Sequence, residues 1–321
     1  NLDFEILKPL IKETVNKIHK LEPEKAQTGP AKRKDFNTIN MHLKMLDEDK
    51  TRELYKIISE MISQQVIQKE SEIINDHIAF RTLGEPHLGI DCIGSIFEAY
   101  GYQKRDYYEF KKKKLNAYWY SPPSETPNLP RVFISELKVN ELSKETQQII
   151  KKYSKGITSS PTKHLDLANG DAVATFFHTP LWEAPNWEEY QHVLQESEYG
   201  AWVLYNRYYL NHFTITIQQL GNGLTTIREF NNFLESFGVK LNDAGGKIKV
   251  SGDGKLLQSS TVAETIMAPF SHEDGSMALY EIAGSYVEFA ERIDGREGFE
   301  AANADKIFES TFTDQVIKSN N

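Results

Sequence analysis

Apolar residues in the first 70 positions recur at steps of three and four, the spacing of one face of an α-helix. The first such stripe consists of Phe4, Leu7, Leu10, Ile11, Val15 and Ile18. Pro23 and Gly29-Pro30 interrupt the pattern, and a second helical run covers residues 52–69. We therefore expect an N-terminal helical segment over residues 1–70.

Beyond residue 70 the pattern changes to short strand-like runs that alternate with single helices, and this order occurs twice. Each copy begins with a strand that carries a histidine near its start, His77 or His212. A helix-like run then ends at a glycine suited to a left-handed cap, Gly101 or Gly238. Two hairpin-like strands and a last strand with a glutamate complete each copy. The repetition predicts two modules of the form βαβββ.

The repeat also predicts how the chain is divided. We expect the first module over residues 71–140 and the second over residues 210–295, with an insert at residues 141–209 and a C-terminal tail at residues 296–321. The insert should contain helices, because Asn186 is followed three positions later by an acidic residue, as at a helix N-cap. The predicted fold class is α+β, with a mixed-sheet core, N-terminal helices and a helical insert. The pattern does not decide whether the insert covers a site as a lid.

The composition narrows the class of protein. The 321 residues include 37 basic and 46 acidic side chains with a net charge of −9, which argues against a general nucleic-acid binder. Cys92 is the single cysteine, so neither an intramolecular disulfide nor a CxxC zinc site can form. No apolar run approaches the roughly 18 residues of a membrane-spanning helix, and no secretory leader is visible after Asn1. We therefore expect a cytoplasmic protein without a membrane or nucleic-acid partner.

The histidines and glutamates of the two modules are the residues best suited to chemistry. If the first and last strands of a module lie side by side, His77 can face Glu136 and His212 can face Glu288. Packing of the modules about a pseudo-two-fold axis would direct these side chains into one cavity. Two imidazoles and one carboxylate suit iron(II), whereas a fourth ligand would suit a Lewis-acid or water-activating metal. Histidines that serve only as hydrogen-bonded strand residues are the alternative.

Arg81 follows His77 by four residues, so the alternation of a strand places both on one face. An arginine beside a metal suits the binding of a substrate carboxylate, and a structural ion pair is the alternative. Gln258 and Ser260, on a strand of the second module, are further candidates for substrate contact. We find no dinucleotide, phosphate-loop or serine-hydrolase motif. The candidate chemistry therefore centres on a metal and a carboxylate substrate.

Four segments in this order resemble the signature segments of a known family: residues 76–82, 133–137, 211–214 and 286–289. The family is that of the 2-oxoadipate dioxygenase/decarboxylases. It is related to the vicinal oxygen chelate superfamily, whose paired βαβββ modules agree with the repeat described above. The resemblance therefore implies a vicinal-oxygen-chelate-like core.

The resemblance also implies a site and a reaction. The metal ligands would be His77, His212 and Glu288, with iron(II) as the metal, and Arg81 would bind a substrate carboxylate. Glu136 would lie near the site, at the corresponding place in the first module, rather than act as a fourth ligand. The reaction would resemble that of hydroxymandelate synthase. A 2-oxo acid such as 2-oxoadipate would react with O2 to give CO2 and a hydroxy acid, here 2-hydroxyglutarate.

Two other functions remain open on the sequence. One is a zinc, nickel or manganese isomerase or hydrolase of the glyoxalase type, which four ligands including Glu136 would favour. The other is a non-catalytic protein that binds a carboxylated metabolite, which failure to bind any divalent metal would favour. The identity and coordination number of the metal separate these functions.

Overall fold

The computed structural model describes residues 74–218, 220 and 224–320. The chain divides into two units, residues 1–73 with 218–225 and residues 74–217 with 226–321, and the description below concerns the second. The helices expected within residues 1–70 lie outside the described residues.

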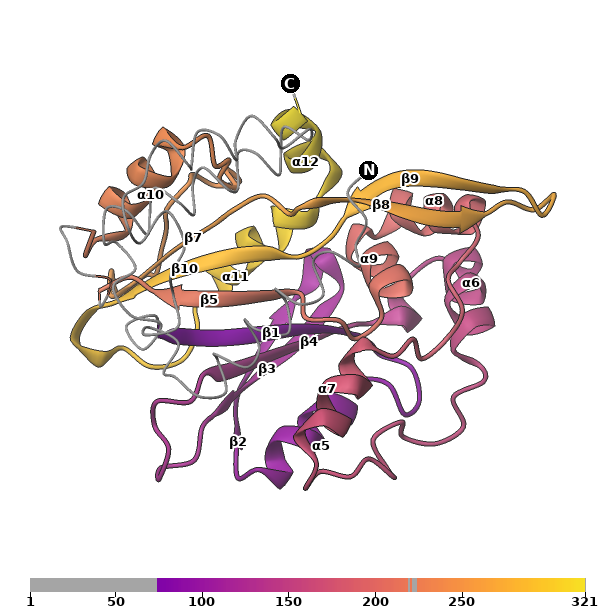
Figure 1. The fold of residues 1–321 in the computed structure, drawn as a ribbon, viewed down its shortest axis with the longest axis horizontal. Helices are drawn as coiled ribbons and strands as arrows, with labels where there is room; N and C mark the ends of the chain where they lie inside the picture. Colours follow the sequence, from indigo (N-terminus) through magenta and orange to yellow (C-terminus); the bar gives the residue numbers. More distant parts are fainter. Residues whose placement is uncertain (1–73, 219, 221–223, 321) are drawn as a thin grey trace, which may run out of the picture. The chain divides into compact units, whose positions relative to one another are not determined.

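A mixed sheet of eight strands forms the centre of this unit (Figure 1). The strands are β1 (Asn75–Leu83), β2 (Gln103–Phe110), β3 (Leu115–Ser121), β4 (Arg131–Leu137), β5 (His212–Thr216), β6 (Lys249–Val250), β7 (Leu256–Ser260) and β10 (Tyr286–Arg292). Their order in the sheet is β2-β3-β4-β1-β5-β10-β7-β6. The first strands of the two modules, β1 and β5, are antiparallel neighbours, and each pairs in parallel with the last strand of its own module. The expected α+β fold of two βαβββ modules is confirmed.

One helix of each module packs on the sheet. Helix α5 (Ile90–Ala99) contacts strands of the first module, and α10 (Ile227–Ser236) contacts strands of the second. Helix α10 begins with a capping box, in which the Thr226 hydroxyl accepts a hydrogen bond from the third residue of the helix. Gly101 and Gly238, which follow the two helices, have φ of +86° and +82°. The left-handed conformation expected at both glycines is therefore present.

The second module contains a hairpin that the sequence pattern did not predict. Strands β8 (Thr265–Ser271) and β9 (Met277–Ala283) lie between β7 and β10 in the chain and pair with each other in a separate sheet. Phe270 lies on the inner face of this hairpin and packs against helices of the insert. The hairpin that was expected is also present, because β6 and β7 pair across a turn in which Gly254 has φ of +70°.

The insert between the modules is helical, as expected. Its helices are α6 (Lys144–Ser154), α7 (Gly170–His178), α8 (Trp187–Glu196) and α9 (Glu198–Asn206). Helix α8 begins at the predicted cap, where the Asn186 side chain accepts a hydrogen bond of 2.8 Å from the Glu189 amide. Helix α9 packs against β1 and brings the Tyr199 hydroxyl to the end of this strand, where it accepts a hydrogen bond of 3.1 Å from the Thr82 amide.

The C-terminal residues, expected as a tail, form ordered elements. These are α11 (Ala301–Ile307), the 3-10 helix η6 (Phe308–Thr311) and α12 (Thr313–Asn320). Shorter 3-10 turns are η3 (Lys111–Lys113), η4 (Val139–Glu141) and η5 (Ile293–Gly295). Helix α11 packs across strands from both modules, β2 as well as β6 and β7. Among the described residues, no helix has the length and apolar character needed to cross a membrane.

Candidate metal centre

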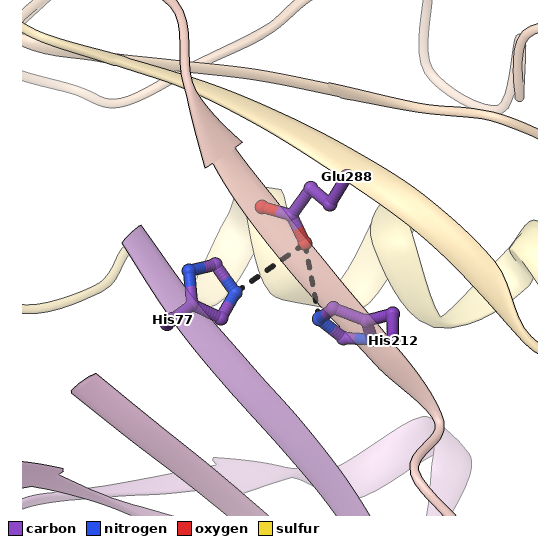
Figure 2. Close-up of side chains that lie close together, drawn as sticks. All are labelled: His77, His212 and Glu288. Carbon is purple, nitrogen blue, oxygen red and sulfur yellow. Dashed lines mark ion pairs between the residues drawn. The ribbon is translucent and has the colours of Figure 1, made fainter. Parts of the chain in front are cut away.

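Three side chains from three adjacent strands converge at the centre of the sheet (Figure 2). They are His77 on β1, His212 on β5 and Glu288 on β10, and their ligand atoms all lie within 4.8 Å of one another. Oε2 of Glu288 is 3.2 Å from Nε2 of His212 and 3.6 Å from Nε2 of His77. The strand register explains this convergence, because Thr214 of β5 is opposite both His77 and Glu288. All three side chains are buried.

Each imidazole is oriented by the residue that precedes it in the chain. Nδ1 of His77 lies 2.8 Å from the Asp76 carboxylate, and Nδ1 of His212 lies 3.0 Å from the Asn211 side-chain oxygen. Both contacts leave Nε2 directed at the centre of the cluster. Metal-binding histidines commonly have a partner of this kind on the other ring nitrogen.

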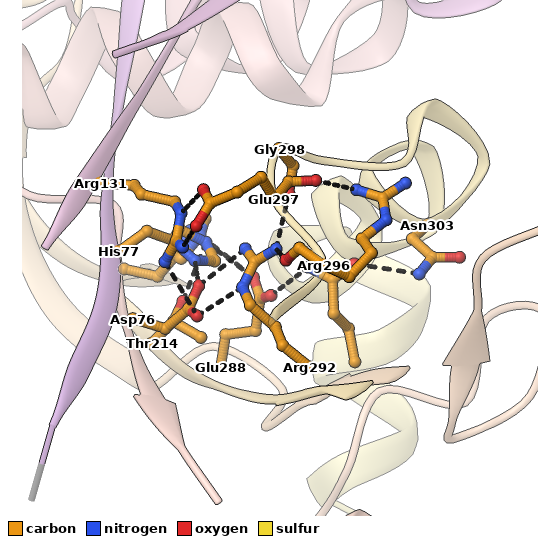
Figure 3. A network of polar contacts seen from close by, with 12 residues as sticks. Asp76, His77, Arg131, Thr214, Glu288, Arg292, Arg296, Glu297, Gly298 and Asn303 are labelled. Atoms are coloured by element: carbon orange, nitrogen blue, oxygen red, sulfur yellow. Dashed lines mark hydrogen bonds and ion pairs between the residues drawn. The ribbon is translucent and has the colours of Figure 1, made fainter. Parts of the chain in front are cut away.

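Asp76 belongs to a larger charged network (Figure 3). Arg292 donates to both of its oxygens, at 2.6 and 2.9 Å, and Arg131 approaches it at 3.5 Å. Burial alone would raise the pKa of Asp76, but the charge of Arg292 and the hydrogen bond from His77 lower it well below the ordinary value. The residue next to His77 is therefore a fixed anion, whereas the residue next to His212 is a neutral amide.

Glu288 is held by a chain of side-chain amides. Gln258 on β7 donates a hydrogen bond of 2.5 Å to Oε1 of Glu288, and Asn303 of α11 donates one of 3.0 Å to the Gln258 side-chain oxygen. The other carboxylate oxygen, Oε2, is the one that faces the two imidazoles. Burial opposes ionisation of Glu288, but the two histidines outweigh it and lower its pKa to about 2.

These donors fit a divalent transition metal. Two imidazole nitrogens and one carboxylate oxygen form the ligand set of mononuclear non-haem iron sites, and zinc, nickel and manganese accept the same donor types. Nε2 of His212 lies 3.2 Å from Oε2 of Glu288, but this contact does not have the geometry of a hydrogen bond within the described part of the chain. A cation bound between the two atoms would interact favourably with both of them.

Arg81 lies on the same side of β1 as His77, as expected, and is 1% exposed. Its two terminal nitrogens donate to the Thr311 hydroxyl at 2.9 Å and to the Phe308 carbonyl at 3.1 Å, while Nε has no partner. The guanidinium group also packs over the ring of Tyr199, 5.0 Å from its centroid. Across the described residues no carboxylate lies within ion-pair distance of Arg81, so its charge is not neutralised by the protein there.

A buried cavity joins His77, His212, Glu288 and Arg81. Its free volume is about 20 Å³, which is room for about one water molecule. Gln258 and Tyr286 contribute polar groups to its wall. Its remaining wall is largely apolar and includes Ala79, Phe80, Phe133, Phe299, Ala304, Ile307 and Phe308. The C-terminal segment, rather than the insert, thus closes the cavity within the described structure.

The expected position of Glu136 near this site is wrong. Its strand does pair with β1, but Glu136 is opposite Thr82, and its carboxylate accepts a hydrogen bond of 3.0 Å from the amide of Ile90 at the start of α5. In the register of the two modules, the counterpart of Glu288 is Phe133, which lines the cavity. Because the two positions differ by an odd number of residues, Glu136 points to the opposite face of the sheet.

The two residues proposed for substrate contact have different positions. Gln258 lines the cavity, but its amide is engaged by Glu288 and Asn303. Ser260 is absent from the cavity wall, and its hydroxyl lies 2.8 Å from that of Ser310. The structure therefore holds Gln258 against Glu288 and does not bring Ser260 to the cavity.

Sequence reasoning missed three contributors to the site. The Asp76-His77 and Asn211-His212 pairs were visible as a repeated polar residue before a histidine, and this signal could have indicated oriented ligands. Tyr286 precedes Glu288 by two residues, which places both on one face of a strand. The cavity-lining residues at 299–308 carried no comparable signal.

The mixed sheet and its paired modules have the fold of glyoxalase, or vicinal oxygen chelate, proteins. A protein from Ralstonia eutropha described as belonging to the glyoxalase superfamily has the same fold, with a TM-score of 0.63 at 18% identity over 78% of this chain and 85% of that chain. A family model described as 2-oxoadipate dioxygenase/decarboxylase matches residues 39–295. The chain belongs to this enzyme family.

Individual relatives agree with this assignment. The chloroplastic 2-oxoadipate dioxygenase/decarboxylase of Arabidopsis thaliana is 42% identical over 78% of this chain and 71% of that protein. The crystal structure of hydroxyglutarate synthase from Oryza sativa, in complex with 2-oxoadipate, has a TM-score of 0.70 at 38% identity, over 91% of this chain and 96% of that chain. Because the Arabidopsis relative is described as chloroplastic, the cytoplasmic location expected for this chain stays a prediction.

Proposed function

We propose that this chain is an iron(II)-dependent dioxygenase and decarboxylase that converts a 2-oxo dicarboxylic acid, such as 2-oxoadipate, into a 2-hydroxy acid one carbon shorter. The observation that carries this proposal is Arg81, a buried cation in the wall of the cavity that contains the three-ligand cluster. A buried charge without an ionic partner is unfavourable, so an anionic ligand is its natural complement. The rice relative crystallised with 2-oxoadipate supports an acid of this kind.

The overall reaction balances without a further reactant. 2-Oxoadipate and O2 give 2-hydroxyglutarate and CO2, and the bond that breaks joins the first carboxylate to the oxo carbon. One oxygen atom of O2 completes the new carboxylate, and the other becomes the hydroxyl group on the adjacent carbon. Bound iron(II) would supply the activation of O2, which side chains alone do not provide.

The side chains of this chain have separable roles in the proposal. His77, His212 and Glu288 would hold the metal through two imidazole nitrogens and one carboxylate oxygen. Arg81 would bind a carboxylate of the substrate through its free Nε and its charge. The aromatic wall, including Phe133, would exclude water from reactive species during turnover.

The test is anaerobic reconstitution of the metal-free protein with iron(II), followed by 2-oxoadipate and isotopically labelled ¹⁸O2. We expect CO2 and 2-hydroxyglutarate that contains two labelled oxygen atoms. His212→Ala is the matched negative control, and His178→Ala, which changes an exposed histidine of the insert, should keep activity. Absence of oxygen uptake with a panel of 2-oxo acids, despite bound iron, would contradict the proposal.

The same experiment distinguishes the proposed dioxygenase from the glyoxalase-type alternative. An isomerase or hydrolase would turn over without O2 and would work with zinc, nickel or manganese. The fourth ligand that would favour it is missing from the described site, because Phe133 occupies the position related to Glu288. Failure to bind any divalent metal with the fold intact would instead favour a metabolite-binding protein.

A further inference from the structure

Tyr286 places an unsatisfied hydroxyl group in the cavity wall. The side chain is buried and lines the same cavity as the three ligands, and its hydroxyl makes no well-formed hydrogen bond within the described residues although it lies close to the Arg81 guanidinium. Arg81 lines this cavity too, and its Nε likewise makes no well-formed hydrogen bond. Buried polar groups in folded proteins are nearly always satisfied. Two neighbouring donors in one cavity, neither with a well-formed hydrogen bond, therefore indicate a polar ligand that is shared between them.

The position of Tyr286 is set by the strands that hold the ligands. It is opposite His212 in the parallel pairing of β10 and β5, and its ring stacks on the imidazole with centroids 4.6 Å apart and planes 25° apart. Burial raises the pKa of the Tyr286 hydroxyl, and the nearby charge of Arg81 offsets this only in part. The phenol is therefore a neutral hydrogen-bond donor at working pH.

Strand geometry places Tyr286 between the row of His77 and Glu288 and the position of Arg81. His77, Thr214 and Glu288 form one row across the sheet, and Tyr286 belongs to the next row with His212. Arg81 lies two residues beyond that second row along β1. At about 3.3 Å per residue, its Cα is roughly 13 Å from that of His77. A ligand held at the metal-binding end and extended along β1 would bring its far end to Tyr286 and Arg81.

We propose that Tyr286 and Arg81 together bind the distal carboxylate of the substrate, the one farther from the oxo group. This inference rests on the proposed function for the identity of the substrate. Arg81 supplies the charge and one N–H donor, and Tyr286 supplies an O–H donor to the same carboxylate. The pair would select 2-oxo dicarboxylic acids over 2-oxo monocarboxylic acids of similar length, because an uncharged end would leave both donors unsatisfied.

The test measures by calorimetry, without O2, how tightly the metal-loaded protein binds 2-oxoadipate and 2-oxohexanoate. The original protein is compared with two variants. Tyr286→Phe keeps the stacked ring and removes only the hydroxyl, and Tyr102→Phe removes a hydroxyl that donates to the Pro130 carbonyl outside the cavity. We expect Tyr286→Phe to weaken 2-oxoadipate binding by about 10- to 100-fold and to leave 2-oxohexanoate binding unchanged. Tyr102→Phe should change neither. In turnover, KM for 2-oxoadipate should rise with little change in kcat.

Unchanged 2-oxoadipate affinity in Tyr286→Phe would overturn the inference. Equal weakening of binding for both acids would also overturn it, because the hydroxyl would then contact the 2-oxo end that the two acids share. Binding without O2 is independent of catalysis, so a protein that binds as expected but does not turn over would contradict the proposed function alone. If Tyr286→Phe does not fold, a crystal structure of the unmodified chain with 2-oxoadipate decides. We expect the Tyr286 hydroxyl within about 3 Å of the distal carboxylate, and a separation beyond hydrogen-bond distance would overturn the inference.

Discussion

The carboxylate of Asp76 lies 2.8 Å from Nδ1 of His77, its neighbour in the chain. Asn211 repeats this contact with His212 at 3.0 Å, so the two modules orient their histidines in the same way but with different chemistry. Burial would lower the pKa of His77, but Glu288 and Asp76 raise it above its ordinary value. Burial dominates at His212 and lowers its pKa to about 4. The two imidazoles that face one cluster are therefore electrostatically unequal.

Asp76→Asn would make the two modules alike and should weaken metal binding by about 10- to 100-fold, as is typical when the partner of a ligating histidine is lost. It should also lower stability, because Arg292 would lose its carboxylate partner in a buried environment. Metal titration of the purified variant measures the first effect, and denaturant unfolding of the metal-free protein measures the second. Asp91→Asn, at a carboxylate that is 90% exposed, is the control and should change neither. Equal metal affinity in both variants would contradict this role for Asp76.

The difference between the pKa values of His77 and His212 predicts how metal binding depends on pH. A metal binds neutral imidazole, so a protonated histidine must lose its proton first. His212 is already neutral above a pH of about 4, whereas His77, with its raised pKa, holds a proton to higher pH. We expect affinity to fall about tenfold per pH unit as the pH drops below the pKa of His77, and to level off above it.

Calorimetry in buffers of different ionisation enthalpy measures this dependence directly. Close to one proton should be released per metal below the pKa of His77, and close to none above it. Removal of the Asp76 charge should move the transition to lower pH, because it removes one of the groups that raise this pKa. Release of two protons per metal near pH 6 would show that His212 is also protonated and would contradict the expected order.

Features set by local sequence were predictable from the residues alone. The repeated histidine at a strand start and the glycines after the helices are local patterns, and Gly101 and Gly238 adopt the expected left-handed conformation. His77 and Arg81 share a face because side chains on any strand alternate. These features depend on a few neighbouring residues and do not require knowledge of the tertiary structure.

Features set by pairing between distant strands were not predictable in the same way. The choice of Glu136 as the counterpart of Glu288 was wrong by three residues, because the register of parallel strands depends on packing rather than on local sequence. The contribution of α11 and η6 to the cavity arises from contacts with residues more than 200 positions away, such as that between Phe308 and Arg81. No short-range pattern encodes such contacts.

Gln258 offers a test of how Glu288 is held. Gln258→Leu should free Oε1 of Glu288 from its 2.5 Å hydrogen bond and allow both carboxylate oxygens to approach the metal. We expect about 10- to 100-fold weaker metal binding and a changed visible absorption spectrum when cobalt(II) is used as a probe. Ser260→Ala, two residues further along the same strand, is the matched control, because its hydroxyl contacts Ser310 outside the cavity. An unchanged cobalt spectrum in Gln258→Leu would contradict the positioning role.

Substitution of Arg81 tests whether this arginine stabilises the fold or binds the substrate. Arg81→Met removes a buried charge that has no ion-pair partner in the described structure and keeps most of the apolar stem. The free energy of unfolding should therefore stay within about 1 kcal/mol of the original or increase, because removal of an unpaired buried charge relieves its desolvation. Binding of 2-oxoadipate without O2 should weaken by at least about 100-fold.

Arg292→Met is the contrasting variant, because Arg292 is also largely shielded from solvent but pairs with Asp76 through two hydrogen bonds. Breaking this pair leaves the buried Asp76 carboxylate with only His77 at 2.8 Å and Arg131 at 3.5 Å, so stability should fall, by up to about 3–5 kcal/mol. Denaturant unfolding of both metal-free variants measures the difference. If Arg81→Met were destabilised as strongly as Arg292→Met, the main role of Arg81 would be structural, through its hydrogen bonds to Thr311 and Phe308. Stability retained together with substrate binding lost is the pattern expected of an arginine whose ionic partner is the substrate.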